Sequence, residues 1–92
     1  GARAVPAFHG GIVGAALQTA ACDLARLERG AGVELINLSI EYSRAAIGTK
    51  SLRIDAFIVR NGRRTLRILA TARQGDDRLV SQAHALFLIA ET

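Results

Sequence analysis

The sequence predicts an α+β domain in which one long helix packs against an antiparallel sheet. Three observations indicate this fold class. The chain has 92 residues, which is enough for one domain at most. Its apolar residues recur at helical spacing before Gly30 and alternate residue by residue after Gly32. Turn sequences then divide the alternating part into four strands, and the last three are expected to form an antiparallel meander.

The helix is predicted over residues 11–29. Gly30 and Gly32 end the helical pattern in the manner of a C-terminal cap. The first half of the segment is nearly free of charged and bulky residues, so we expect the helix to be buried on most sides, with the sheet wrapped closely around it. The positions at helical spacing are Ile12, Ala16, Thr19/Ala20, Leu24 and Leu27.

Four strands are expected, within residues 33–43, 51–62, 63–74 and 78–91. The pair Asn61-Gly62 indicates a two-residue hairpin, because a type I′ turn needs positive φ at both central positions. The sequence Gly-Asp-Asp at 75–77 indicates the next turn. Alternation places Ile36, Leu38, Ile40 and Tyr42 on one face of the first strand, and Leu52, Ile54, Ala56 and Ile58 on one face of the second.

The distribution of charge indicates an anionic partner. Residues 44–78 hold nine Lys and Arg against three Asp, whereas the rest of the chain sums to −2. Nucleic acid, a phosphorylated small molecule and simple decoration of exposed strand faces are all compatible with this pattern. Only 4% of the residues are aromatic, and base-stacking side chains among the arginines are missing, so we expect no nucleic-acid partner.

The apolar segments are too short for a membrane span, and the single cysteine, Cys22, rules out an internal disulfide. We therefore expect no membrane association and a reducing, cytoplasmic location. A chain this short would gain stability from an oligomer interface, and the sheet face that the helix leaves uncovered is expected to pack on another copy.

His9, Gly10 and Gly11 stand at the start of the predicted helix. The first backbone N–H groups of a helix lack intrahelical acceptors and carry partial positive charge. Glycine has no side chain, so a ligand can approach these donors closely. A carboxylate, a phosphate or the oxygen of a polarised carbonyl would fit there, and His9 could orient the same group. A simple turn before a helix is the alternative interpretation.

Four segments together resemble the hotdog-fold acyl-CoA thioesterases of the PaaI-like group. They are FHGGIVGAALQTAA from Phe8, VELINLSIEYSRAA from Val33, RNGRR from Arg60 and LVSQAHALFLI from Leu79. The resemblance covers essentially the whole chain and implies a single hotdog domain over residues 1–92, with a curved antiparallel sheet wrapped around one long helix. The family's first strand and leading segment have no counterpart here, so residue 1 is expected to lie inside the natural domain.

The resemblance also implies a catalytic site between two protomers, in a homodimer or a dimer of dimers. The Gly11 amide, helped by Gly10 and His9, would polarise a thioester carbonyl. A carboxylate of the other protomer would activate water or attack the carbonyl itself. That carboxylate falls nine residues after the histidine, where this chain has Gln18. Glutamine cannot take up a proton near neutral pH or act as a nucleophile.

Other residues are weaker candidates for the missing base. Asp23 lies five positions after Gln18, roughly 140° around the helix, and is expected to face elsewhere. Cys22 shares the face of Gln18 and could be a nucleophile, but a small buried cysteine is the simpler interpretation. His84 is expected to be a structural or surface residue of the last strand.

Coenzyme A gives the basic segment a concrete partner, because arginine forks bind phosphate groups well. By resemblance, Arg44, Arg63 and Arg64 lie near the nucleotide. Weaker candidates are Lys50, Arg60 and Arg67. We expect no metal and no separate cofactor, since coenzyme A enters as part of the substrate. Two functions stay open: hydrolysis of acyl-CoA or related acyl thioesters, and non-catalytic binding of acyl-CoA or another acyl ligand.

Overall fold

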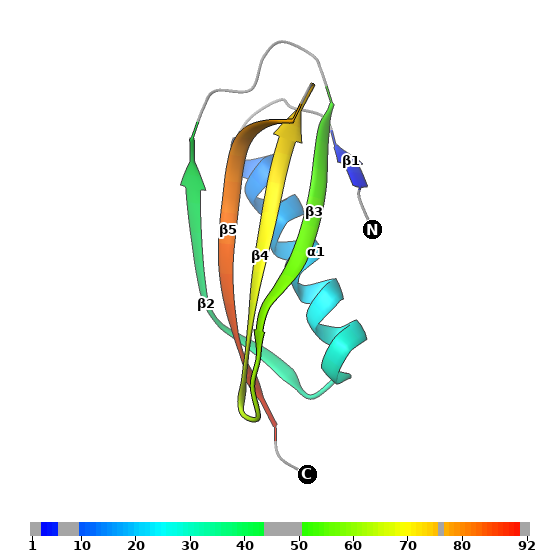
Figure 1. Ribbon diagram of the computed structural model, residues 1–92, viewed down its shortest axis with the longest axis vertical. Coiled ribbons are helices and arrows are strands. Elements are labelled where there is room, and N and C mark those ends of the chain that lie inside the picture. The colour runs from blue at the N-terminus through cyan, green and yellow to red at the C-terminus, as the bar shows by residue number, and fades with distance from the viewer. Residues whose placement is uncertain (1–2, 6–9, 44–50, 76, 91–92) are drawn as a thin grey trace.

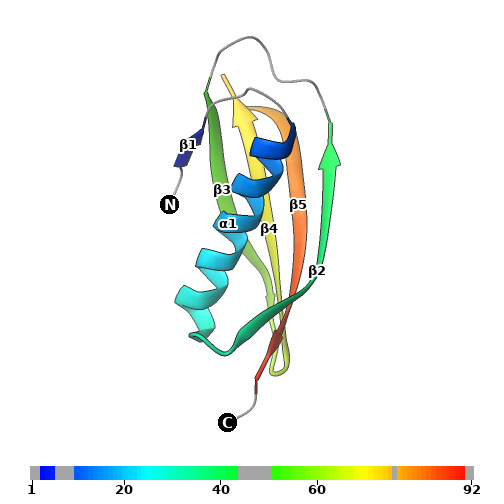
Figure 2. The ribbon, with the colours of Figure 1, turned by 180° about the vertical axis from the view of Figure 1, so that it is seen from behind.

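The structure is a computed structural model that describes residues 3–5, 10–43, 51–75 and 77–90. Within these ranges a 20-residue helix lies across one face of a five-stranded antiparallel sheet (Figure 1, Figure 2). The strand order across the sheet is β1-β3-β4-β5-β2. The elements in chain order are β1 (Arg3–Val5), α1 (Gly10–Arg29), β2 (Val33–Tyr42), β3 (Leu52–Asn61), β4 (Thr65–Gln74) and β5 (Arg78–Ile89).

The predicted succession of one helix and four strands is confirmed for the described residues between 10 and 89. β3, β4 and β5 form the expected meander, and β2 pairs with the free edge of β5. The structure adds β1, which precedes the helix and pairs with β3 so that Val5 lies opposite Leu52. This strand is not among those that the sequence predicts, because three residues are too few for an alternating pattern to show.

α1 contributes one stripe of small side chains to the core. Val13, Leu17, Ala21 and Ala25 recur every four residues and are at most 3% exposed. They pack against the inner faces of β3, β4 and β5, whose large buried side chains are Leu52, Ile54, Leu66, Ile68 and Phe87. Burial of each of these large apolar side chains stabilises the fold by roughly 1.5–3 kcal/mol.

The buried stripe of α1 differs from the predicted one. Ala16, Ala20 and Leu24 lie beside it and are only half-buried, and Leu27 is 84% exposed. The other side of the helix, including Ala15, is exposed in the single chain, so the prediction of a helix buried on most sides is wrong for one protomer. Alanine is compatible with a buried face and with an exposed one, so an alanine-rich helix does not show which side faces the sheet.

A β-bulge shifts the two faces of β2. The pairing of β2 with β5 slips between Leu35 and Asn37, which leaves Ile36 without a partner. As a result Leu35 packs against the core together with Leu38 and Ile40. Ile36 is instead 48% exposed. Its predicted place on the same face as Leu38 is therefore wrong, because strict alternation does not reveal an inserted residue.

The β3–β4 hairpin forms where predicted, but with a different turn. Three residues, 62–64, connect the strands, and neither Asn61 nor Gly62 has positive φ. Gly62 donates its N–H to the carbonyl of Thr65 at 2.9 Å, and a Cβ on Gly62 would lie 3.1 Å from that oxygen. This position thus needs glycine for a close approach rather than for a left-handed conformation. The predicted turn after β4 is confirmed, with Gly75 at φ 59°.

Candidate functional site

The start of α1 offers backbone donors. The helix begins at Gly10, one residue before the predicted start, so the N–H groups of Gly10, Gly11 and Ile12 precede the first intrahelical hydrogen bonds. The first turn holds no acidic side chain that would balance the positive end of the helix dipole. His9 lies outside the described residues. This helix start can hold an anion or a carbonyl oxygen.

β2 packs closely against the same end of α1. Gly14 is buried, and a Cβ there would lie 3.3 Å from Ile40 Cδ1 and 3.4 Å from the Tyr42 hydroxyl. The Tyr42 hydroxyl therefore lies over the helix about one turn from Gly10. Neither Gly14 nor Tyr42 was predicted as a site residue from the sequence. The signal that could have indicated this contact is a glycine inside an otherwise alanine-rich helix.

Gln18 lies on the exposed side of α1, where a shallow groove has a volume of about 360 Å³. An amide, a hydroxyl, a thiol, a carboxylate and a guanidinium line this one surface. The lining residues are Ala15, Gln18, Thr19, Cys22, Asp23 and Arg26. The position at which the resemblance implies a catalytic carboxylate is thus open to solvent in the single chain.

The expectation that Asp23 faces away from Gln18 is wrong. Both side chains line the same groove, because helical side chains lean toward the N-terminus and cover the surface of the preceding turn. Asp23 is the one carboxylate among the described residues that line this groove. Cys22 shares the face of Gln18 as predicted, is half-buried and packs against the core, which agrees with its interpretation as a structural cysteine.

The hairpin that carries Arg63 and Arg64 is held by the last turn of α1. Arg29 Nη1 donates to Asn61 Oδ1 at 2.7 Å and to the Gly62 carbonyl at 2.6 Å. Arg29 Nη2 donates to the Arg63 carbonyl at 3.2 Å. We call these three bonds the Arg29 clamp. Sequence reasoning missed it, since a basic residue in the last helical turn is expected for the helix dipole alone.

The predicted site residues lie toward opposite ends of the molecule. α1 has 20 residues, so its start and the hairpin beyond its end are about 30 Å apart. Figure 1 shows the hairpin at the end of the molecule farther from the helix start. Gln18 lies about 12 Å along the helix from Gly10. One chain brings neither Gln18 nor the hairpin arginines to the glycine amides, and Arg44 lies outside the described residues.

The strand carboxylates belong to the sheet face that α1 does not cover. Asp55 pairs with Arg53 at 3.1 Å, and Glu41 lies 3.9 Å from His84. The hydrogen bond to Asp55 is the main cause that raises the pKa of the Arg53 guanidinium, and the hydrogen bond to Asp77 is the second cause. His84 is exposed on the last strand, as predicted for a surface residue. These groups therefore do not border the helix start.

In the described part of the chain, no three His, Cys, Asp or Glu side chains lie together as a metal site would require. No helix of that part combines the length and apolar character needed to cross a membrane. The groups that the candidate site does offer are the backbone amides of the helix start, the side chains of the groove around Gln18, including the Asp23 carboxylate, and the guanidinium groups of the hairpin.

One helix packed against a curved antiparallel sheet defines the hotdog fold class of proteins, and in this chain the helix begins with two glycines. A family model described as the acyl-CoA thioesterase N-terminal domain matches residues 2–88. The chain belongs to this family. The resemblance to hotdog-fold acyl-CoA thioesterases that the sequence motifs indicated is therefore confirmed. None of the curated proteins compared with the chain matches it.

Solved structures with the same fold include a phenylacetic acid degradation-related protein of Ralstonia eutropha JMP134, with a TM-score of 0.71 and 30% identity over 88% of this chain and 61% of that chain. A Bacillus halodurans protein solved with CoA has a TM-score of 0.81 and 21% identity, over 99% of this chain and 68% of that chain. A Thermus thermophilus thioesterase complexed with coenzyme A and zinc has a TM-score of 0.75 and 12% identity, over 98% of this chain and 78% of that chain. The chain spans 61% of the length of the Ralstonia protein and of another thioesterase-superfamily protein.

Proposed function

We propose that this chain hydrolyses the thioester bond of acyl-CoA, or of a related acyl thioester, at a site formed between two protomers. The observation that carries the proposal is a helix that begins at a glycine pair, in a chain of the acyl-CoA thioesterase N-terminal domain family. The Gly11 amide, with Gly10 and His9 beside it, would donate to the carbonyl oxygen and stabilise the negative charge that develops there during attack.

The dimensions of one chain support a shared site. The glycine amides lie farther from Gln18 and from the hairpin arginines than a side chain spans. A second protomer whose helix runs in the opposite direction would bring its own Gln18 and hairpin toward those amides. The exposed groove around Gln18 is the surface that such a partner would cover. We therefore propose a cytoplasmic homodimer as the smallest active unit, with a dimer of dimers as the larger assembly.

In the proposed reaction, water attacks the carbonyl carbon and loses a proton to the solvent. The carbon–sulfur bond then breaks, and coenzyme A leaves as a thiolate that takes up a proton from the solvent. Gln18 would hold the attacking water through its side-chain amide, but it cannot accept the proton that the water loses. A missing proton acceptor commonly costs about 10²- to 10⁴-fold in rate. We therefore expect slow hydrolysis.

Coenzyme A is the proposed carrier of the acyl group because Arg44, Arg63 and Arg64 supply guanidinium groups for its phosphates. Arg63 and Arg64 are exposed, and the Arg29 clamp holds the backbone that carries them. The Bacillus halodurans and Thermus thermophilus proteins, whose fold this chain shares, were solved with coenzyme A, which supports the assignment.

The glutamine at position 18 favours a second candidate function, the non-catalytic binding of acyl-CoA or another acyl ligand. Such a protein keeps the helix-start donors and the basic hairpin but has no carboxylate at position 18. Hydrolysis stands first because the backbone donors that polarise the carbonyl are retained, and these act without a base.

Replacement of Gln18 by Glu separates the two functions. Purified wild type and Gln18→Glu are compared on a panel of acyl-CoA thioesters, with release of free thiol as the measurement. If only the base is missing, the variant gains about 10²- to 10⁴-fold in rate. Thr19→Glu adds the same charge one position away in the same groove, and no gain is expected from it.

An unchanged rate in Gln18→Glu together with tight coenzyme A binding would support the binding function instead. A chain that neither hydrolyses the thioesters nor binds coenzyme A would contradict both functions.

A further inference from the structure

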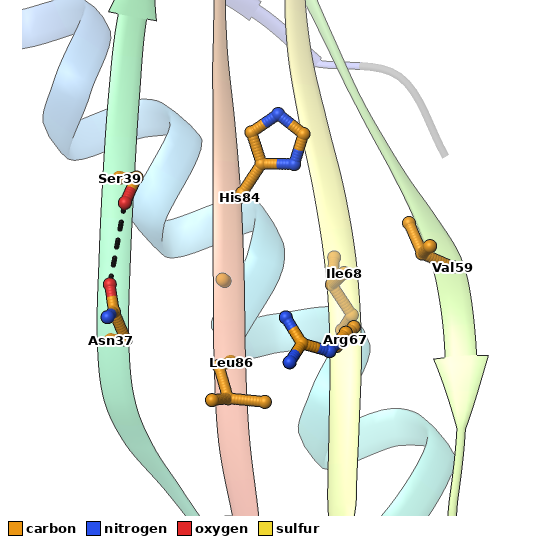
Figure 3. A pocket seen from close by; sticks show the side chains of 8 residues that line it. Asn37, Ser39, Val59, Arg67, Ile68, His84 and Leu86 are labelled. Carbon is orange, nitrogen blue, oxygen red and sulfur yellow. Dashed lines mark hydrogen bonds between the residues drawn. The ribbon is translucent and has the colours of Figure 1, made fainter.

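The sheet face opposite α1 contains a hollow with a volume of about 260 Å³ (Figure 3). Four strands contribute to it, namely β2, β3, β4 and β5. The side chains that stand around it are Asn37, Ser39, Val59, Arg67, His84 and Leu86. Polar and apolar groups thus meet in one small cavity on a face that the candidate thioester site does not use.

The register of the strands brings these side chains together. Asn37 on β2 pairs with Leu86 on β5, and Leu86 pairs in turn with Arg67 on β4. Ser39 pairs with His84 in the next row. Paired residues in a sheet point to the same face, so an amide, a hydroxyl, an imidazole and a guanidinium converge there.

A β-bulge in β3 provides the fourth side of the hollow. The pairing of β3 with β4 slips between Ile58 and Arg60, which leaves Val59 without a partner. Val59 lines the hollow and is 60% exposed in the single chain. The bulge therefore supplies an apolar wall next to the polar groups.

Two donor groups in the hollow have no partner among the described residues. Arg67 takes part in no ion pair or hydrogen bond there. The Asn37 Oδ1 atom accepts a hydrogen bond from the Ser39 hydroxyl at 3.5 Å, which leaves Asn37 Nδ2 as an available donor. Figure 3 shows the Arg67 side chain leaning from β4 toward β5, with its guanidinium between His84 and Leu86.

The charges around the hollow also favour an anion. Arg60 is the cross-strand partner of Arg67, and like charges directly opposite each other destabilise a sheet unless a counter-charge lies near. The carboxylate of Glu41 accepts a hydrogen bond from Gln82 Nε2 at 3.2 Å and lies 3.9 Å from His84 Nε2. The Glu41 carboxylate thus interacts with Gln82 and His84 rather than with Arg60 or Arg67.

We propose that this hollow binds a small organic carboxylate. The carboxylate would accept two parallel hydrogen bonds from the Arg67 guanidinium and one from Asn37 Nδ2. A short apolar group of the ligand would lie against Leu86. A volume of about 260 Å³ fits an acid of a few carbon atoms. The proposal does not depend on the proposed hydrolysis.

The test is a titration of isotope-labelled protein with butyrate, followed by the NMR shifts of the backbone amides. Saturable shifts are expected at Asn37, Arg67 and Leu86, with a dissociation constant on the order of 1 mM for so small a ligand. Arg67→Gln is expected to weaken binding about 10-fold or more, because a charge-assisted bidentate contact is lost. Arg67→Lys keeps the charge without the planar fork and is expected to give an intermediate loss.

The matched control is Arg53→Gln, which removes one charge from the same face away from the hollow and is expected to weaken binding by less than about 3-fold. Equal losses in Arg53→Gln and Arg67→Gln would overturn the proposal, because they would show general attraction of anions to a basic face. Equal affinity for butyramide would overturn it as well. Shifts of the same amides on dilution without butyrate would show that a second copy covers the hollow, which also overturns it.

Discussion

The two ends of α1 are built differently. At the C-terminal end, Gly30 adopts φ 83° and donates its N–H to the Arg26 carbonyl at 2.8 Å, and Arg29 ties the last turn to the β3–β4 hairpin. At the N-terminal end, Gly10 and Gly11 leave backbone donors without an acidic side chain in the first turn. The comparison teaches that the helix is anchored at one end and presents backbone donors without intrahelical acceptors at the other.

The largest effect is expected at the N-terminal end. Gly11→Pro removes the amide hydrogen proposed to bind the carbonyl oxygen, while proline is tolerated in the first turn of a helix. We expect the rate of thioester hydrolysis to fall by about 10²- to 10³-fold with the fold retained. Steady-state kinetics measures the rate of hydrolysis, and circular dichroism checks that the fold is retained. Gly11→Ala keeps the N–H group and should lose less, and a Gly11→Pro variant as active as wild type would contradict the role of this amide.

A smaller effect, on stability rather than on chemistry, is expected at the C-terminal end. Arg29→Met removes the Arg29 clamp and should lower the free energy of unfolding by about 1–3 kcal/mol, as measured by urea denaturation. The kcat should change little, whereas the KM for acyl-CoA should rise because the hairpin is less well held. Arg26→Met serves as the stability control, since Arg26 donates no side-chain hydrogen bond to the hairpin within the described residues. Equal stability of the two variants would contradict the clamp.

The smallest effect is expected at the cap itself. A Cβ on Gly30 would meet nothing within 4 Å, so Gly30→Ala costs only the strain of a left-handed backbone, about 1 kcal/mol. Gly32→Ala is the matched control, because Gly32 has no positive φ and its Cβ would make an ordinary 3.4 Å contact with Ala90. Thermal unfolding of both variants checks the difference, and a Gly30→Ala protein as stable as Gly32→Ala would show that the cap does not need glycine.

The element types could be predicted because the hydrophobic period changes once, near Gly30, and because turn residues separate the strands. The details that depend on tertiary contacts could not. The bulge at Ile36 exchanges the faces of β2. The alternation of apolar and polar residues in the sequence does not reveal this bulge. Asn61-Gly62 has the composition of a type I′ turn, but Arg29 bonds to Asn61 and Gly62 and the connection takes three residues.

The candidate site was predictable where it depends on one local segment. Glycines before an apolar helix indicate accessible amides, and α1 does begin at Gly10. The groove that Gln18 and Asp23 share was not predicted. The angle between two Cα positions around the helix axis does not account for the length and direction of the side chains. The Arg29 clamp joins residues more than 30 positions apart, and no local pattern indicates such a contact.

The clamp has a thermodynamic consequence for ligand binding. Arg29 already fixes the carbonyl group of Arg63, so the loop that presents this guanidinium loses little conformational entropy when a phosphate binds. In a hairpin held only by its own turn, ordering would oppose binding by roughly 1–2 kcal/mol for each backbone residue immobilised. Here that ordering takes place during folding, and the proposed phosphate ligand would meet a preorganised loop.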